Sequence, residues 1–354
     1  MFKTILITGG AGFVGSNLAI YLQNSCRFSK ILVLDNLKRR GSELNLNRLA
    51  ANGIDFVHGD VRNFADIKSV GNFDLLIECS AEPSALAGYY ESPEYLLHTN
   101  VQGTINCLEI IRQTNASIIF LSTSRVYPIQ NLCELELIEK ETRFSLALKN
   151  CYPGVTALGV NEDFPLYNPR TLYGTSKLAS ELLLLEYFST YEVTGVINRC
   201  GVIAGPWQMG KVDQGFISLW IASHIFNKKL KYIGFNGSGK QVRDVLHIND
   251  LCELIQIQIE ELEKFNGKTF NIGGGLKNSI SLLELTALVQ EATGKSMNIA
   301  KSVESRPGDI PWYITDYSKI NQLSVWYPRL NLENIIEDTV SWIQGRKEQL
   351  KNIF

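Results

Sequence analysis

The sequence lacks the cysteine and histidine patterns that mark disulfide-rich or metal-binding proteins. Its seven cysteines are scattered over 354 residues and never form a CxxC pair, a usage that suits a reducing compartment such as the cytoplasm. Its four histidines are also far apart, without the short spacings of metal ligands. We therefore expect a cytoplasmic protein with no disulfide framework and no metal site.

Long apolar runs and an excess of either charge are missing as well. No apolar run approaches the ~20 residues of a membrane-spanning helix, and the apolar start leads directly into a glycine loop, so we interpret it as a first strand and not a signal peptide. The net charge of -2 gives no bulk reason to expect nucleic-acid or membrane binding. The composition, 45% hydrophobic and 20% charged, is typical of a soluble globular protein with one large or two closely associated domains.

What the sequence does contain is a glycine-rich loop between a predicted strand and a predicted helix. Lys3–Thr8 is predicted as a buried strand, the residues GGAGFVG follow, and a helical pattern then runs through Leu22. Glycine permits the tight turn and the close approach of backbone amides to a pyrophosphate, which then lies at the helix N-terminus. We assign cofactor binding to Gly9, Gly12, Phe13, Val14 and Gly15.

An acidic residue follows these glycines at the distance that dinucleotide-binding folds use. The second predicted strand, Ile31–Leu34, ends at Asp35, twenty residues past Gly15. A carboxylate there accepts hydrogen bonds from ribose hydroxyls and repels a 2′-phosphate, so Asp35 favours NAD over NADP, although Arg39 and Arg40 lie close by. The adjacent Asn36 is also assigned to cofactor binding. A Rossmann-like fold that binds another nucleotide, or none, is the alternative.

Strands and helices alternate along the first half of the chain. A long helix is predicted over Pro93–Gln113, and further strands are predicted near Asp55–Val57, Leu75–Ile77, Ser117–Leu121 and Val193–Asn198. This alternation predicts an α/β fold of Rossmann type with a right-handed, doubly wound parallel sheet. Ligands of such sheets bind beyond the carboxyl ends of the strands, where Glu82 and Thr123 are expected.

The second half of the chain has a looser pattern. We place the NAD-binding domain at 1–198, with a further piece near 241–265, and a smaller, interleaved substrate domain at 199–354. The segment between Tyr127 and Tyr173 is long and irregular, and we interpret it as an excursion on the substrate side.

Tyr173 and Lys177 are four residues apart on a predicted helix. This spacing puts both on one face, so the ammonium of Lys177 can lie near the phenol of Tyr173. A phenol has a pKa of about 10, and an adjacent cation lowers that pKa, so such a tyrosine can accept or return a hydroxyl proton. The same spacing is common on exposed helices, so the pair alone is weak evidence of catalysis.

Together the motifs resemble the extended short-chain dehydrogenase/reductase superfamily, specifically its nucleotide-sugar epimerases and dehydratases. They occur in family order over nearly the whole chain: TGGAGFVG from Thr8, DNL from Asp35, GD from Gly59, STSRVYP from Ser122, YGTSK from Tyr173 and RPGD from Arg306. The resemblance implies tightly bound NAD and a catalytic triad of Thr123, Tyr173 and Lys177, in which Tyr173 is the acid/base and Lys177 also holds the nicotinamide ribose. It adds Asp60, Val61 and Ala81 to the cofactor-binding residues.

The resemblance also implies a nucleotide-diphosphate sugar as the substrate, bound by the domain at 199–354. Arg243 and Arg306 match the diphosphate-binding arginines of the family, and bidentate guanidinium contacts suit that ligand. For either arginine the alternative is a surface salt bridge. The other substrate-binding candidates are Glu82, Ser124, Arg125, Val202 and Gln214.

Finer motifs resemble the members of the superfamily that invert C2 of a CDP-hexose. These motifs are DNLKRRG from Asp35, ETRF from Glu141 and GKQVRDVLH from Gly239. The implied reaction passes through a transient keto sugar that bound NAD forms and then reduces from the opposite face. A 4-epimerase of the same superfamily is the main alternative, and a non-catalytic NAD-binding regulatory or scaffold protein is a further one.

Several positions depart from the pattern of the superfamily. Glu78 stands where relatives usually carry histidine, and the identities of Glu82 and Val202 leave the sugar and the carbon attacked open. Ser124 and Arg125 replace the Asp-Glu pair of the dehydratases, which argues against elimination. A homodimer or homotetramer is implied by the resemblance, although a leucine run such as Leu182–Leu185 is also common in a core.

Overall fold

The chain forms two compact units. The computed structural model describes residues 2–25, 30–147, 152–211, 214–304 and 306–354. The first unit comprises Met1–Thr123, Leu172–Arg199 and Leu251–Phe270, and the second comprises Ser124–Thr171, Cys200–Asp250 and Asn271–Phe354. Within the described part of the chain, none of the helices has the length and apolar character needed to cross a membrane.

The first unit is built around a seven-stranded sheet with the order β14-β10-β5-β4-β1-β2-β3. Its strands are β1 (Thr4–Thr8), β2 (Lys30–Asp35), β3 (Asp55–His58), β4 (Leu75–Glu78), β5 (Ser117–Thr123), β10 (Gly195–Cys200) and β14 (Lys268–Ile272). β1 runs parallel to β2 and β4, and the pairs β2–β3 and β4–β5 are parallel too. The strand order reverses at β1, which confirms the predicted Rossmann-type sheet.

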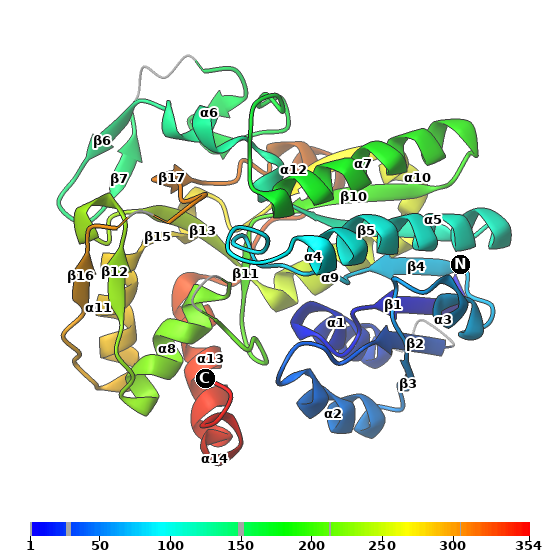
Figure 1. The fold of residues 1–354 in the computed structure, drawn as a ribbon, viewed down its shortest axis with the longest axis horizontal. Coiled ribbons are helices and arrows are strands. Elements are labelled where there is room, and N and C mark those ends of the chain that lie inside the picture. Colours follow the sequence, from blue (N-terminus) through cyan, green and yellow to red (C-terminus); the bar gives the residue numbers. More distant parts are fainter. Residues whose placement is uncertain (1, 26–29, 148–151, 212–213, 305) are drawn as a thin grey trace. The chain divides into compact units, whose positions relative to one another are not determined.

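Both faces of this sheet are buried, as a parallel sheet requires. On one face Leu6 and Leu76 join a core cluster with residues of the flanking helices, among them Leu108 and Leu184. Figure 1 shows α5 and α7 beside each other along this sheet, and the two helices are in contact. The helices of the unit are α1 (Phe13–Asn24), α2 (Asn45–Ala51), α3 (Phe64–Ser69), α4 (Glu94–Leu97), α5 (Gly103–Thr114), α7 (Leu172–Thr190), α9 (Ile248–Glu260, whose first turn belongs to the second unit) and α10 (Leu262–Phe265).

The single helix predicted over Pro93–Gln113 needs a correction. The structure has α4, then a π-helical turn at His98–Gln102, then α5. In the π turn the carbonyl of Asn100 accepts hydrogen bonds from the hydroxyls of Thr104 (2.7 Å) and Ser180 (2.9 Å). These hydroxyls can take the place of the backbone amide that would bond the carbonyl in a regular α-helix. Turns of π-helix recur at functional sites.

The second unit contains a smaller mixed sheet. β13 pairs in parallel with β11 and β17 and antiparallel with β15. The strands are β6 (Leu137–Glu139), β7 (Phe144–Leu146), β8 (Val155–Thr156), β9 (Gly159–Val160), β11 (Val202–Ala204), β12 (Lys231–Ile233), β13 (Val242–His247), β15 (Ser279–Ser281), β16 (Ala300–Ser302) and β17 (Trp312–Tyr313). The helices are α6 (Ile129–Cys133), α8 (Phe216–Phe226), α11 (Leu282–Thr293), α12 (Ser318–Ser324), α13 (Leu332–Gly345) and α14 (Lys347–Leu350).

The excursion between Tyr127 and Tyr173 belongs to this second unit. The amide of Phe144 on β7 donates to the carbonyl of Lys240 at 2.9 Å, and Nη2 of Arg143 donates to Oγ of Ser279 at 3.0 Å. The units therefore divide the chain differently from the predicted ranges 1–198 and 199–354, and the later piece of the first unit is Leu251–Phe270 instead of 241–265. Bonds between residues about a hundred positions apart leave no periodic signal in the sequence.

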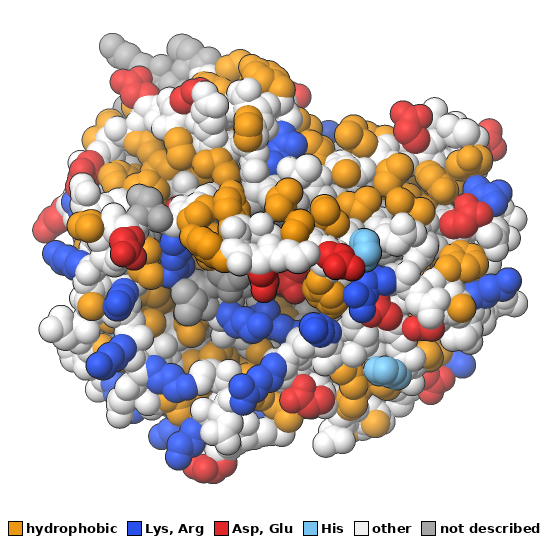
Figure 2. Space-filling model, viewed as in Figure 1, with side chains coloured by type: hydrophobic (Ala, Val, Ile, Leu, Met, Phe, Trp, Pro, Cys, Tyr) orange, Lys and Arg blue, Asp and Glu red, His pale blue; other side chains and the backbone are white. Residues whose placement is uncertain are grey.

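Charges of both signs are spread over the surface. Figure 2 shows Lys and Arg side chains interspersed with Asp, Glu and hydrophobic side chains on the face in view. This mixing agrees with the net charge of -2.

Candidate active site

The glycine loop joins β1 to α1 and leaves room for a phosphate. A Cβ at Gly15 would lie 2.4 Å from the carbonyl oxygen of Gly9, so only glycine lets α1 approach the loop this closely. A Cβ at Gly12 would meet the backbone of Gly9 at 3.0 Å and otherwise open space. α1 begins at Phe13, and the first amides of a helix, here including that of Val14, have no acceptor within it. The loop therefore fits the pyrophosphate of a dinucleotide.

Asp35 closes the loop from the end of β2. Its Oδ2 accepts a hydrogen bond from the amide of Ala11 at 3.1 Å, and its Oδ1 accepts one from the amide of Leu37 at 2.8 Å. Burial raises the pKa of this carboxyl, and the backbone hydrogen bonds oppose that rise. A carboxylate at this place can also accept hydrogen bonds from ribose hydroxyls, as the sequence predicts for Asp35.

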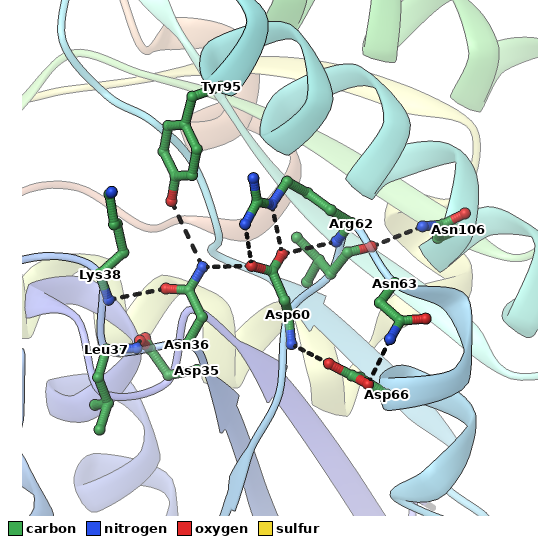
Figure 3. A network of polar contacts seen from close by, with 11 residues as sticks. Asp35, Asn36, Leu37, Lys38, Asp60, Arg62, Asn63, Asp66, Tyr95 and Asn106 are labelled. Atoms are coloured by element: carbon green, nitrogen blue, oxygen red, sulfur yellow. Dashed lines mark hydrogen bonds and ion pairs between the residues drawn. The ribbon is translucent and has the colours of Figure 1, made fainter.

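A polar network beside Asp35 connects three segments of the first unit (Figure 3). Nδ2 of Asn36 donates to Oδ2 of Asp60 at 2.9 Å and reaches the hydroxyl of Tyr95 at 3.5 Å. Arg62 donates to both oxygens of Asp60, through Nε at 3.0 Å and Nη2 at 2.7 Å. The guanidinium of Arg62 and the ammonium of Lys38 lie 4.7 and 5.3 Å from the centre of the Tyr95 ring. The network fixes Asn36 and Asp60 where an adenosine would lie.

Asp60 is held in its charged form by this network. Burial alone would raise the pKa of its carboxyl, but the hydrogen bonds from Arg62 and Asn36 outweigh burial and lower the pKa to about 2. The next residue, Val61, is buried, and its carbonyl accepts a hydrogen bond from Nδ2 of Asn106 at 2.8 Å. Asp60 and Val61, both predicted to bind the cofactor, therefore have fixed positions.

The three predicted catalytic residues all belong to the first unit. Thr123 is the last residue of β5, and Tyr173 lies in the first turn of α7 with Lys177 one turn later. α7 packs against β5. Thr123 and Lys177 are buried, whereas Tyr173 is half-buried. A buried cation one helical turn from a partly exposed phenol is the arrangement that lets a tyrosine act as a proton acceptor and donor.

Lys177 is buried and contacts two neighbouring strands. Its side chain is 2% exposed, and its ammonium lies 3.5 Å from Oε2 of Glu78 on β4. The same nitrogen lies 4.1 Å from the centre of the Phe120 ring on β5. The sequence marked Glu78 as a departure from the superfamily but did not predict that it pairs with Lys177.

Asn100 links the π turn to α7 and to the segment after β4. Its Nδ2 donates to Oγ of Ser176 at 2.9 Å, and its Oδ1 accepts from the amide of Glu82 at 2.8 Å. The carboxylate of Glu82 accepts from the amide of Ser84 at 3.2 Å. Ala81, which precedes Glu82, is half-buried. The predicted cofactor residue Ala81 and substrate residue Glu82 are thus tied to the helix that carries Tyr173.

Arginines converge on the turn at 306–309 in the second unit. Nη1 of Arg125 donates to the carbonyl of Gly308 at 3.0 Å, and Nη2 of Arg243 approaches Oδ1 of Asp309 at 3.3 Å. Burial and the neighbouring charge of Arg125 lower the pKa of Arg243 to about 10. Arg306 begins this turn and is half-buried. Two neighbouring guanidiniums beside the carboxylate of Asp309 form a site suited to an anion.

The remaining substrate candidates also lie in the second unit. Val202 opens β11 and is paired with Val245 on β13, one strand away from Arg243. Gln214 precedes α8, and its backbone exchanges hydrogen bonds with Lys211. Ser124 begins the 3₁₀ turn that carries Arg125. The structure therefore groups Arg125, Arg243 and Arg306 but places Gln214 in a separate turn.

Sequence reasoning missed three residues that shape the site. Ser176 lies within the YGTSK motif, so the motif could have identified it. Tyr95 gave no signal, because its part in the network depends on Lys38 and Arg62 from other segments. Asn100 lies within the helix predicted over Pro93–Gln113, but its bonds to Ser176 and Glu82 appear only in the fold.

Comparison with known proteins adds to this geometry. The family model described as "NAD dependent epimerase/dehydratase family" matches residues 5–273. The chain is 34% identical to CDP-paratose 2-epimerase of Salmonella typhi over 96% of this chain and 98% of that one. It is 29% identical to dTDP-glucose 4,6-dehydratase of Mycolicibacterium smegmatis over 97% and 94% of the two chains.

A solved structure agrees with the fold. The structure of dTDP-glucose 4,6-dehydratase from Bacillus anthracis in complex with NAD superimposes with a TM-score of 0.77 and 26% identity, covering 99% of this chain and 100% of that one. The likeness spans both compact units and includes the segments that carry the glycine loop, Asp35 and Lys177.

Proposed function

Because the chain belongs to the NAD-dependent epimerase/dehydratase family, we propose that it is a nucleotide-sugar epimerase that inverts C2 of a CDP-hexose of the paratose or tyvelose type. The observation that carries this proposal is the likeness to CDP-paratose 2-epimerase over nearly the full length of both chains. NAD is the cofactor of the family, and we propose that it stays tightly bound through the reaction.

The first unit supplies the acid–base chemistry in this proposal. Tyr173 accepts the proton of the C2 hydroxyl and later returns it, while the nearby ammonium of Lys177 stabilises the phenolate. The hydroxyl of Thr123 donates a hydrogen bond to the same sugar oxygen. The half-burial of Tyr173 supports this role, because a base must be reachable by substrate.

We assign the binding of the cofactor to groups of the first unit. The loop Gly9–Gly15 holds the pyrophosphate, Asp35 accepts hydrogen bonds from the adenosine ribose, and Lys177 donates to the nicotinamide ribose. When bound, NAD+ would accept the hydride from C2 and return it to the other face of the resulting ketone. No net oxidation of the sugar results.

The second unit supplies the anion-binding groups. Arg243 and Arg306 hold the diphosphate, and the position of Arg125 near Arg243 adds a third positive charge. Firm binding of the diphosphate leaves the sugar ring free to turn while the substrate stays bound. This freedom is needed because both faces of C2 must meet the cofactor in turn.

Dehydration is disfavoured by the residues after Thr123. Dehydratases of the superfamily carry an Asp-Glu pair there, which removes a ring proton and protonates the leaving hydroxyl. Here the positions hold Ser124 and Arg125, and the guanidinium of Arg125 donates to the carbonyl of Gly308. Neither side chain is a carboxyl, so the acid–base pair of an elimination is missing from these two positions.

The test is turnover of CDP-paratose or CDP-tyvelose in D2O without added cofactor, followed by NMR. Inversion at C2 without deuterium at that carbon would support a bound cofactor that carries the hydrogen. Deuterium uptake at C2 would contradict the proposal, and inversion at C4 of a UDP-hexose with no reaction of the CDP-sugars would replace it with a 4-epimerase. Tyr173→Phe should abolish turnover and keep NAD bound, whereas Tyr191→Phe, at an exposed tyrosine just after α7, should change neither.

A further inference from the structure

Lys177 shares its buried site with a carboxylate. The ammonium lies 3.5 Å from Oε2 of Glu78, and both side chains are 2% exposed. Glu78 is the last residue of β4, the strand next to β1, and Lys177 lies on α7. The pair therefore joins two elements far apart in the sequence and sits one helical turn from Tyr173.

The carboxylate of Glu78 is oriented toward this ammonium. The hydroxyl of Ser80 donates to its Oε1. Its Oε2 is buried and has no hydrogen-bond partner among the described residues, so the ion pair with Lys177 is the interaction that balances its charge. A buried carboxylate whose charge is balanced by one cation interacts strongly with that cation.

The other charged and titratable groups around Lys177 are few in the described part of the chain. Cys107 on α5 feels the charges of both Glu78 and Lys177, and burial raises the pKa of its thiol well above the usual range, so it stays neutral. Glu181, one turn further along α7, is paired with Arg199 on β10 at 2.7 Å. On the β5 side the ammonium meets the neutral ring of Phe120. Tyr173 lies one helical turn before Lys177 on α7.

We propose that Glu78 is a positioning residue that restrains the acid–base pair: its carboxylate offsets part of the charge of Lys177 and thereby sets the pH at which Tyr173 releases its proton. This inference rests on the proposed role of Tyr173 as the base. A phenolate is stabilised by the ammonium and destabilised by the carboxylate behind it. The chain should therefore form its phenolate at higher pH than the same site would with Lys177 alone.

The test is Glu78→Gln, which keeps the size of the side chain and removes its charge. The titration of Tyr173 is followed in the NAD-bound protein by the near-ultraviolet absorbance of tyrosinate. The absorbance of a protein that also carries Tyr173→Phe is subtracted, both for the wild type and for Glu78→Gln, so that only the signal of Tyr173 remains. The proposal expects the midpoint of Tyr173 to fall in Glu78→Gln by on the order of one pH unit, a tenfold gain in phenolate at a given pH. A midpoint that is unchanged or higher would overturn it.

A conservative variant separates charge from structure. Glu78→Asp keeps the carboxylate. The titration midpoint of Tyr173 should therefore move from its wild-type value by no more than about a third of the shift seen for Glu78→Gln. If Asp shifts the midpoint as much as Gln does, shape and not charge is responsible, and the proposal fails. Circular dichroism and retained NAD establish that each variant is folded. Since the titration needs no substrate, its outcome is independent of whether the C2-epimerase assignment holds.

Discussion

Nδ2 of Asn100 donates to Oγ of Ser176 at 2.9 Å across 76 positions of sequence. The bond joins the π turn before α5 to the helix that carries Tyr173 and Lys177. Because the same amide group also bonds the backbone of Glu82, Asn100 fixes the distance between the substrate-side segment and the catalytic helix.

Asn100→Ala should destabilise the protein by about 2–3 kcal/mol, because the amide of Glu82 and the hydroxyl of Ser176 lose a buried partner. Urea unfolding measures the change. Ser176→Ala, which removes one of these bonds, should cost about 1 kcal/mol. Equal losses of unfolding free energy in the two variants would show that Asn100 acts through Ser176 alone.

Gly15→Ala should release NAD. The added Cβ would lie 2.4 Å from the carbonyl oxygen of Gly9 and 2.7 Å from Cα of Gly10, so the loop or α1 must shift. The measurement is the amount of NAD released on denaturation of the purified protein. Gly345→Ala is the matched control, because a Cβ at that position meets nothing within 4 Å. Full NAD content in Gly15→Ala would contradict the role of the loop.

Asp60 should make the protein sensitive to acid. The pKa of its carboxyl is about 2 in the folded state and 3.8 in its unperturbed state. The folded pKa is the lower one, so the stabilisation is present above about 3.8 and is lost as the pH falls toward about 2. Over this pH range the free energy of unfolding should rise less steeply with pH for Asp60→Asn than for the wild type. Parallel slopes would mean that Asp60 is not the group responsible.

Arg243→Met should raise the KM for the nucleotide sugar by about 10- to 100-fold, the loss expected for charge-assisted hydrogen bonds. NAD content should stay the same, because Arg243 belongs to the second unit and the glycine loop to the first. Steady-state kinetics and competition with CDP measure the effect. Arg329→Met, at an exposed arginine of the same unit, is the control. An unchanged KM for Arg243→Met would exclude the residue from diphosphate binding.

The local features of the fold could be predicted from the sequence. The strands from Thr4 to Thr123 and the glycine loop between the first strand and the first helix each depend on neighbouring residues, and the structure confirms them. The π turn could not be predicted, because the hydroxyl of Ser180 that bonds Asn100 comes from a distant helix. The same holds for the pair Glu78–Lys177, whose two members are 99 positions apart. A motif names a residue, but its partner depends on the tertiary fold.

The assignment of Leu251–Phe270 to the first unit has a consequence for how the protein is made. The ribosome must release 272 of the 354 residues before β14, the last strand of the seven-stranded sheet, can add to it. Until then the edge at β10 stays open, and an open strand edge is a site for wrong pairing. We expect nascent chains shorter than this to depend on chaperones, and a domain cut at residue 198 to be insoluble.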